Sequence, residues 1–340
     1  MKNRFTHIIY FFVGFIFTIL FLELFLKFSE IKLPYKTIDE KAGKTYQSDV
    51  LIHETKEGFF MDKTNAYGFI GDTCKSNKKF RIALFGDSYT EGFQLFRKYH
   101  FSEILEQELN KKSAVQVEVF NFGMSNVVLP EMYIRKKALA EQFNIDLFVY
   151  VLDSYDFIFL PEGILNSVAL TEVNHTLQVT SVPSKSFDFY KKVQPVIDNS
   201  SYLNFVFDAY LLIRRQQALP IILDKFYTTR PNYTYYQKTN SYDTFEYIPA
   251  QYFKIIQEIE KEPSVFVFRE DVDTTLKSKL SNYKIPVIET KTVLDELRNE
   301  GINPYYWELT QTYGHLNHHG NQKMGVYLSE KLLPYVRSKK

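Results

Sequence analysis

Cysteine is almost absent from this 340-residue chain, in which Cys74 is the only one. An intramolecular disulfide is therefore impossible, and zinc sites built from cysteine pairs are excluded. Neither sign of charge dominates, because 41 Lys and Arg stand against 40 Asp and Glu. The sequence thus lacks the basic field of a nucleic-acid-binding protein and the acidic blocks of a disordered tail, and we expect no nucleic-acid partner.

Several common catalytic and cofactor-binding motifs are also missing. The chain has no Walker loop and no G-x-G-x-x-G fingerprint. It lacks the lipase G-x-S-x-G elbow, because Thr90 stands where the second glycine would be. His315, His318 and His319 have a spacing that could hold zinc, but no nearby aspartate completes a ligand set. We therefore predict neither a metal nor a cofactor.

The longest apolar run lies at the N-terminus. Residues 5–22 contain no Asp, Glu, Lys or Arg. After Glu23, the run continues to Phe28 and is interrupted only by Lys27. At about 1.5 Å rise per residue, such a helix nearly spans a hydrocarbon core of roughly 30 Å. No A-x-A-like cleavage site follows, so we predict an uncleaved signal anchor at 7–28.

Basic residues flank this anchor on both sides. Lys2 and Arg4 precede it, and three lysines follow between residues 27 and 36. The positive-inside rule is therefore nearly balanced. Because short N-terminal tails usually stay inside, we expect residues 1–6 to be cytoplasmic. The protein would then be a single-pass membrane protein whose globular part lies outside the cytoplasm, in a periplasm or on the cell surface.

Strand and helix patterns alternate through most of the remaining chain. Short apolar runs predict five strands, and amphipathic stretches between them predict helices. Strands are expected at 80–85, 115–120, 145–152, 264–268 and 285–288, and helices at 102–109, 130–143, 250–260, 272–280, 292–297 and 317–336. This alternation predicts an α/β fold with a five-stranded parallel sheet, whose active site lies beyond the carboxyl ends of the strands.

Two segments depart from this alternation. Residues 29–78 show little periodicity, and we interpret them as a juxtamembrane connector ahead of a domain at 79–338. Residues 157–247 are long for a crossover between strands, and they hold a helix pattern at 203–213 and a polar, tyrosine-rich stretch at 228–244. We interpret residues 157–247 as an insertion that forms a lid or a docking surface.

One motif of the chain carries recognisable chemistry. Gly86-Asp87-Ser88 follows the first predicted strand, so Ser88 should project from the carboxyl end of that strand. A serine hydroxyl is a weak nucleophile at neutral pH and needs a base within hydrogen-bond reach. His315, just before the last predicted helix, is the best candidate for this base.

GDSYTEG at 86–92, together with HLNHHG at 315–320, resembles the SGNH (GDSL-type) hydrolase family. The likeness covers about 65–336 apart from the insertion. Within the family, the chain resembles membrane-anchored bacterial members. It implies a flavodoxin-like three-layer sandwich, a catalytic pair of Ser88 and His315, and ester chemistry. It does not identify the substrate.

Two of the family's oxyanion positions hold unusual residues. The second donor, usually a glycine amide, falls on Asn126, and a backbone N–H can still serve there because asparagine tolerates the left-handed region. The third donor, usually an asparagine side chain, falls on Tyr155, whose hydroxyl can donate but reaches further. With Ser88, these residues form the expected oxyanion hole, in which losing one donor typically costs about 10²–10³ in turnover.

The aspartate that orients the histidine in this family is missing as well. The family spacing puts Thr312 at its position. Glu308 is the nearest upstream carboxylate and could substitute from the loop. Asp87 is close to Ser88 in sequence, but it is better explained as a residue that braces the turn than as a catalytic acid.

These departures leave several hypotheses open. The first is a serine esterase that acts on small acyl esters, such as the O-acetyl groups of an envelope glycan. The second is a degenerate SGNH-like domain that binds a glycan or serves in assembly without turnover. An O-acyltransferase and a lipid-directed lysophospholipase or thioesterase are further alternatives.

Overall fold

The computed structural model describes residues 2–29, 36–55, 57–72, 80–157, 168–174, 176–181, 185–214 and 248–337. These residues form two compact units. The sheet domain takes its residues from Ile38–Ser184 and Pro231–Lys340, and the helical unit takes its residues from Met1–Thr37 and Lys185–Arg230.

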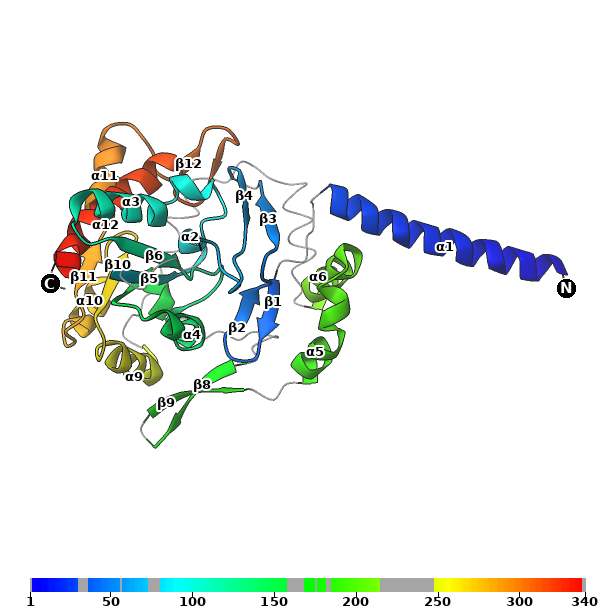
Figure 1. Cartoon of the computed structure of the whole chain (residues 1–340), viewed down its shortest axis with the longest axis horizontal. Coiled ribbons are helices and arrows are strands. Elements are labelled where there is room, and N and C mark those ends of the chain that lie inside the picture. The colour runs from blue at the N-terminus through cyan, green and yellow to red at the C-terminus, as the bar shows by residue number, and fades with distance from the viewer. Residues whose placement is uncertain are drawn as a thin grey trace. The chain divides into compact units, whose positions relative to one another are not determined.

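The sheet domain is built on five parallel strands (Figure 1), which are β5 (Phe80–Gly86), β6 (Val117–Asn121), β7 (Leu147–Leu152), β10 (Ser264–Phe268) and β11 (Val287–Glu289). Their order is β11-β10-β7-β5-β6, in which the first strand in sequence lies between the second and the third. This is the flavodoxin-like order. β5, β7 and β10 are buried throughout, as expected for strands covered on both faces. The predicted fold class is confirmed.

Helices cover both faces of the sheet (Figure 1). One face packs against α3 (Phe101–Lys112), α11 (Lys291–Asn299) and α12 (His318–Arg337), which contribute leucines and a methionine to a common core with the strands. The other face carries α4 (Leu129–Arg135) and α9 (Ala250–Ile259). α10 (Thr274–Leu280) connects β10 to β11. The predicted helix at 130–143 is shorter in the structure, since a π-helical turn at Lys136–Ala140 follows α4.

Aromatic rings fill the second face of the sheet. The ring of Phe85 stacks on Phe122 at 5.4 Å and on Tyr150 at 5.3 Å between centroids. Phe157 stacks on Phe268 at 6.1 Å and contacts Tyr252 of α9. Much of the aromatic content of the chain is therefore core packing, which buries large apolar area and adds ring–ring attraction.

The segment assigned to the connector belongs mostly to the sheet domain, which corrects the boundary expected at residue 78. Residues from Ile38 onward cluster with the sheet. They form four short strands, and Ile52 and Phe60 are buried. The strands are β1 (Lys36–Asp39), β2 (Gly43–Tyr46), β3 (Leu51–Glu54) and β4 (Phe60–Lys63), paired as β1-β2 and β3-β4. Strands of four residues are too short to show a periodic pattern, which is why sequence reasoning missed them.

The predicted insertion is described only in part. β8 (Val168–Val173) and β9 (Thr176–Ser181) form an antiparallel hairpin in the sheet domain. α5 (Lys185–Ile197) and α6 (Ser201–Arg214) belong to the helical unit, and α6 contains the helix pattern expected at 203–213. The tyrosine-rich stretch at 228–244 lies outside the described residues, so its interpretation as a lid stays a prediction.

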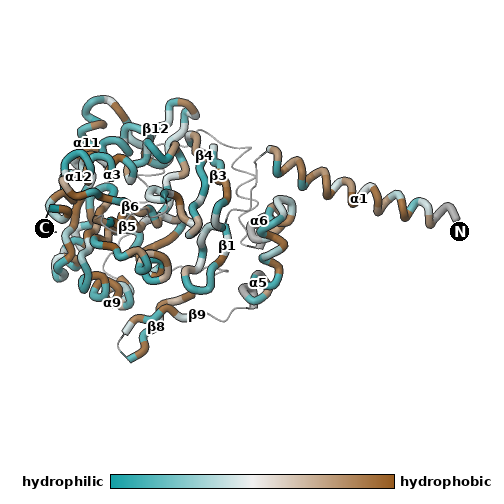
Figure 2. Tube along the Cα trace, in the orientation of Figure 1, coloured by the Kyte–Doolittle hydropathy of each residue, from teal (hydrophilic) through white to brown (hydrophobic). Residues whose placement is uncertain are grey.

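α1 (Lys2–Phe28) has the length and composition of a membrane span. Its stretch Phe5–Phe28 has a mean hydropathy of 2.5, and none of its most apolar window is buried. Figure 2 shows the apolar residues along the whole helix. At about 1.5 Å per residue, such a helix is long enough to cross a hydrocarbon core of roughly 30 Å. α1 is the candidate membrane span among the described residues, and its orientation stays a prediction.

Leu105 tests the packing of α3 on the sheet. The side chain is fully buried in the core that α3, α12 and the strands share. Leu105→Ala should lower the free energy of unfolding by about 2–5 kcal/mol, because the cavity it leaves adds to the lost burial. Urea unfolding of the purified protein measures this change. Gln107→Ala, at an exposed position of the same helix, should stay within about 0.5 kcal/mol of the parent.

Candidate active site

Ser88 stands at the first position of α2 (Ser88–Glu91), directly after β5. Asp87 caps this short helix, and its carboxylate accepts a hydrogen bond from the backbone N–H of Tyr89 at 3.0 Å. Gly86 permits the sharp turn, because a Cβ there would lie 2.1 Å from Thr90 Oγ1 and 2.8 Å from the carbonyl oxygen of Val151. The local sequence thus presents a serine hydroxyl at the carboxyl end of a buried strand.

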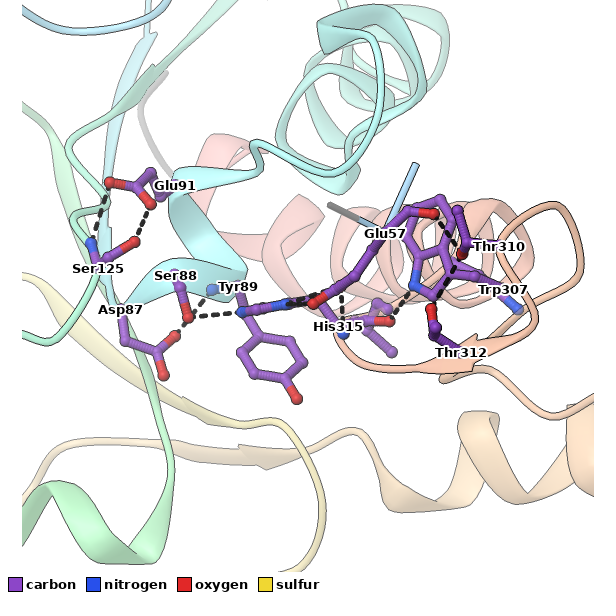
Figure 3. Close-up of polar contacts among 12 residues, drawn as sticks. Glu57, Asp87, Ser88, Tyr89, Glu91, Ser125, Trp307, Thr310, Thr312 and His315 are labelled. Carbon is purple, nitrogen blue, oxygen red and sulfur yellow. Dashed lines mark hydrogen bonds and ion pairs between the residues drawn. The ribbon is translucent and has the colours of Figure 1, made fainter. Parts of the chain in front are cut away.

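His315 lies in the loop that leads into α12, and its imidazole faces Ser88 (Figure 3). The Nε2 atom is 2.7 Å from Ser88 Oγ, a hydrogen-bond distance. The side chain of His315 is 22% exposed, so a substrate can approach the pair. The structure therefore brings the two residues together as the sequence predicted.

Glu57 lies beside His315, at the place for which the sequence offered Glu308 as a substitute carboxylate. Its two carboxylate oxygens both lie 2.9 Å from His315 Nδ1, and Oε2 also accepts the backbone N–H of His315 at 2.8 Å. A carboxylate only accepts, so Nδ1 carries the proton and Nε2 is free to accept from Ser88. This assigns the tautomer that a general base needs.

The loop around His315 is shaped to receive this carboxylate. A Cβ at Gly314 would lie 2.3 Å from the carboxyl carbon of Glu57, so only glycine leaves room for it. The hydroxyl of Thr310 donates to the backbone carbonyl of Glu57 at 2.7 Å. Trp307 Nε1 donates to the carbonyl of His315 at 2.9 Å. These bonds hold the two segments in register.

Of the three residues proposed from sequence for orienting or bracing, Asp87 is the one that braces the nucleophile turn. Thr312 Oγ1 lies 2.9 Å from Thr310 Oγ1 and so supports the residue that holds Glu57. Glu308 is exposed. Asp87 caps α2 and forms an ion pair with Arg269 at 3.2 Å. The carboxylate beside His315 Nδ1 is therefore that of Glu57, from the segment assigned to the connector, and not that of Glu308.

Arg269, just after β10, is a buried cation beneath the nucleophile turn. Its guanidinium pairs with Asp87 at 3.2 Å and with Asp153 at 3.3 Å, and it lies 3.7 Å from the ring centroid of Tyr89. Burial lowers the pKa of Arg269, but the two carboxylates outweigh this and raise the pKa above its ordinary value. Arg269 therefore stays charged and ties the ends of β5, β7 and β10 together.

Asp156 is a second buried carboxyl group near this cluster. Burial raises its pKa well above the ordinary value, and the nearby charge of Asp87 raises it further. Its carboxylate accepts the backbone N–H of Asp153 at 2.8 Å. Because one arginine faces several carboxyl groups here, a proton on Asp156 relieves their mutual repulsion.

The loop after β6 holds Asn126, the predicted second oxyanion donor. Asn126 has a φ of 59°, the left-handed conformation that asparagine tolerates. Among the described residues, no hydrogen-bond acceptor pairs with its backbone N–H or with that of Ser88. Both amides are thus available to a ligand, as an oxyanion hole requires.

Glu91 holds this loop against the nucleophile turn. It is buried, and its carboxylate accepts the backbone N–H of Ser125 at 3.0 Å together with the hydroxyls of Ser125 and Tyr46. Glu91 is therefore a buried link between the two segments and does not face solvent. Asn121 adds a second tie, because its amide donates to the carbonyl of Thr90 at 2.6 Å.

Tyr155, the predicted third donor, lies in a short 3₁₀ turn (Ser154–Phe157) after β7. It is half-buried, and its backbone N–H donates to Asp153 at 3.0 Å. The structure therefore places Tyr155 at the same edge of the sheet as Ser88. Its role as an oxyanion donor stays a prediction.

No group of three or more His, Cys, Asp or Glu could hold a metal ion within the described part of the chain. His315 is engaged by Ser88 and Glu57 instead. The ring of His318 packs against Tyr99 and Trp307. The zinc alternative thus receives no support from the geometry.

The chain resembles known proteins in structure but not in sequence. No protein-family model and no curated protein matches it. Solved structures do match it. The structural matches are to GDSL-type hydrolases and related esterases.

Three of these structures illustrate the likeness. A member of the lipolytic protein G-D-S-L family from Veillonella parvula DSM 2008 matches 74% of this chain and 97% of its own, at 13% identity and a TM-score of 0.35. The lipase/acylhydrolase from Enterococcus faecalis matches 75% of this chain and 96% of its own, at 12% and 0.39. A two-domain esterase active on acetylated mannans matches 77% of this chain and 50% of its own, at 12% and 0.37.

At these identities and TM-scores, the matches assign neither substrate nor activity. The fold follows from the strand order of the chain itself, and the candidate site follows from its own contacts. Both agree with the resemblance to SGNH hydrolases that the sequence motifs indicated.

His100 provides a test of how the nucleophile turn is supported. It is buried, its Nε2 lies 3.0 Å from the carbonyl oxygen of Tyr89, and its Nδ1 lies 2.7 Å from Ser102 Oγ. Burial lowers the pKa of His100 to about 4 from its ordinary value of 6.5. The unfolded chain therefore binds a proton more tightly than the folded one between these values, and protonation opposes folding.

Stability should thus fall as the pH drops from 6.5 toward 4, with His100 contributing on the order of 3 kcal/mol to that fall. Urea unfolding across this range measures the slope. His100→Gln should flatten the slope although it lowers stability near neutral pH, where the contact with Tyr89 is weakened. His319→Gln, at an exposed position, should leave the slope as it is. An unchanged slope in His100→Gln would contradict the assignment.

Proposed function

We propose that the sheet domain is a serine esterase of SGNH type whose catalytic triad is Ser88, His315 and Glu57. The observation that carries the proposal is the continuous chain of hydrogen bonds, 2.7 Å from Ser88 Oγ to His315 Nε2 and 2.9 Å from His315 Nδ1 to Glu57. A nucleophile, a base and an orienting carboxylate in this order are the parts that acyl transfer through serine needs.

Acylation begins at Ser88. Its Oγ attacks the ester carbonyl carbon while His315 Nε2 takes the hydroxyl proton, and Glu57 stabilises the resulting imidazolium. The carbonyl oxygen becomes an oxyanion in the tetrahedral intermediate. The intermediate then expels the alcohol, which receives the proton from His315, and the acyl group remains on Ser88.

The oxyanion would be held by the free backbone amides of Ser88 and Asn126, with the hydroxyl of Tyr155 as a third donor. The bonds from Glu91 to Ser125 fix the loop that carries Asn126, so the amides are oriented before the substrate binds. Such preorganised donors are worth about 10²–10³ each in turnover. The hydroxyl of Tyr155 lies further from the backbone than the amide of an asparagine would.

Deacylation reverses these steps with a second nucleophile. Water gives its proton to His315 and attacks the acyl carbon, and the carboxylic acid leaves as Ser88 regains its proton. If a glycan hydroxyl takes the place of water, the same steps make an O-acyltransferase.

The substrate class we propose is a small acyl ester, with O-acetyl groups of an envelope glycan as its leading member. α1 supports this assignment, because a membrane anchor would hold the domain next to envelope polymers. Under this proposal the N-terminus is cytoplasmic and the sheet domain lies outside the cytoplasm. Lipid esters remain the second substrate class, since the same anchor brings the domain close to lipid.

A serine-directed fluorophosphonate probe distinguishes the esterase from a domain that binds its ligand without catalytic turnover. The full-length protein in detergent should be labelled and should hydrolyse p-nitrophenyl acetate. Ser88→Ala should abolish the labelling, because it removes the only atom in the triad that attacks the probe. A folded parent protein that neither labels nor turns over the ester would refute the esterase and favour the binding domain.

The second test compares Glu57 with Glu308 as the carboxylate that orients His315. Glu57→Gln should lower kcat by about 10²–10⁴, because a neutral amide neither fixes the tautomer nor stabilises the imidazolium. Its shape is kept, so thermal unfolding should change little. Glu308→Gln is the matched control and should keep parental kcat. Equal kcat in the parent and Glu57→Gln would remove Glu57 from the triad while leaving the Ser88 result intact.

A further inference from the structure

Glu23 is the one acidic residue within the apolar stretch Phe5–Phe28 of α1. An ionised carboxylate near hydrocarbon is costly unless it is paired and hydrogen-bonded. Its partners in the structure come from the start of α6. Glu23 accepts the Ser200 hydroxyl at 2.7 Å, the Ser201 N–H at 3.1 Å and the Tyr202 N–H at 2.9 Å.

These bonds make Glu23 an N-terminal cap supplied by another helix. The first amides of a helix lack partners within the helix, and the positive end of its dipole favours an anion. Lys27, one turn further along α1, lies 3.4 Å from the same carboxylate. Leu26 is buried in this region, unlike most of α1. α6 therefore begins beside the last turns of α1 (Figure 1).

α6 is too short to cross a membrane but too apolar to be left in water. Its 14 residues, SYLNFVFDAYLLIR, span about 21 Å at 1.5 Å per residue, against a core of roughly 30 Å. Four of its side chains form an exposed apolar stripe at i, i+3, i+7 and i+10. They are Leu203 (36% exposed), Val206 (44%), Tyr210 (51%) and Ile213 (68%).

α5 extends the same kind of surface. Phe189 and Val196 are 61% and 56% exposed, and the helix sequence also contains three lysines, at 185, 191 and 192. Apolar side chains alternating with lysines are typical of helices that lie at a membrane surface, where the lysines reach the headgroups.

We propose that the apolar stripe of α6 lies in the bilayer boundary around α1, with Glu23 fixing where α6 enters it. The lipid is the occupant that the structure favours, because the stripe begins beside α1, none of whose most apolar window is buried. The inference goes beyond the esterase proposal and depends on α1 being a membrane helix.

Spin labels on the full-length protein test this inference, in vesicles of phosphatidylethanolamine and phosphatidylglycerol. In a Cys74→Ser background, Val206→Cys and Ile213→Cys carry the label. Phe15→Cys in α1 serves as the lipid reference, and Gln322→Cys, exposed on α12, as the water reference. Collision rates with oxygen and with a water-soluble nickel chelate are measured at each site.

Labels at 206 and 213 should collide more with oxygen than with nickel, as at 15, whereas 322 should show the reverse. Nickel-dominated collisions at 206 and 213 would place the stripe in water. Low collision rates with both reagents would place it against protein, such as a second copy. Either result overturns the proposal. Water exposure at position 15 would overturn its premise as well.

Glu23→Ala tests the cap itself. It should make the label at 206 more mobile and move it to a different depth, because the start of α6 loses its anchor. Glu23→Gln keeps one acceptor oxygen and should show a smaller change. Thr18→Ala, on the same helix, should show none, and an unchanged label in Glu23→Ala would exclude the cap. Fluorophosphonate labelling of the same samples reports on Ser88 separately.

Discussion

The candidate site depends on the contact between the carboxylate of Glu57 and Nδ1 of His315. It joins a segment near the start of the sheet domain to the loop before its last helix. Without it, the imidazole would have neither a fixed tautomer nor a counter-charge, and Ser88 would face an unoriented base. Glu57 lies between the short strands β3 and β4, which position it beside the histidine. Gly314 leaves room for its carboxylate.

A second layer of charge supports the other side of the nucleophile. Arg269 ties Asp87 to Asp153, while Glu91 ties the turn to the loop of Asn126. Each bond connects the carboxyl ends of two different strands. A parallel sheet alone would leave these loops free to move independently, so the buried ion pairs and hydrogen bonds set the geometry at the site. A rigid sheet with loops fixed by buried polar contacts is typical of preorganised sites.

The sheet could be predicted from sequence because its strands are buried on both faces and read as continuous apolar runs. Ser88 and His315 could be predicted because each sits next to such an element. Glu57 could not. It follows a four-residue strand with no periodic pattern, and its partner is 258 residues away. The usable signal was Gly314, since a glycine directly before a candidate base implies that something approaches the backbone closely.

The missing aspartate of the SGNH motif has a counterpart in the structure. Thr312 stands at the motif's aspartate position and has no carboxylate to offer the histidine, and Glu57 supplies one from a segment outside the motif. Thr312 kept a part in the arrangement through Thr310, which holds the carbonyl of Glu57. The carboxylate of Glu57 is buried, which is costly without a partner, and the imidazole and backbone N–H of His315 are its partners. The buried carboxylate, the imidazole that it orients and the serine hydroxyl that faces this imidazole together support the proposed catalysis.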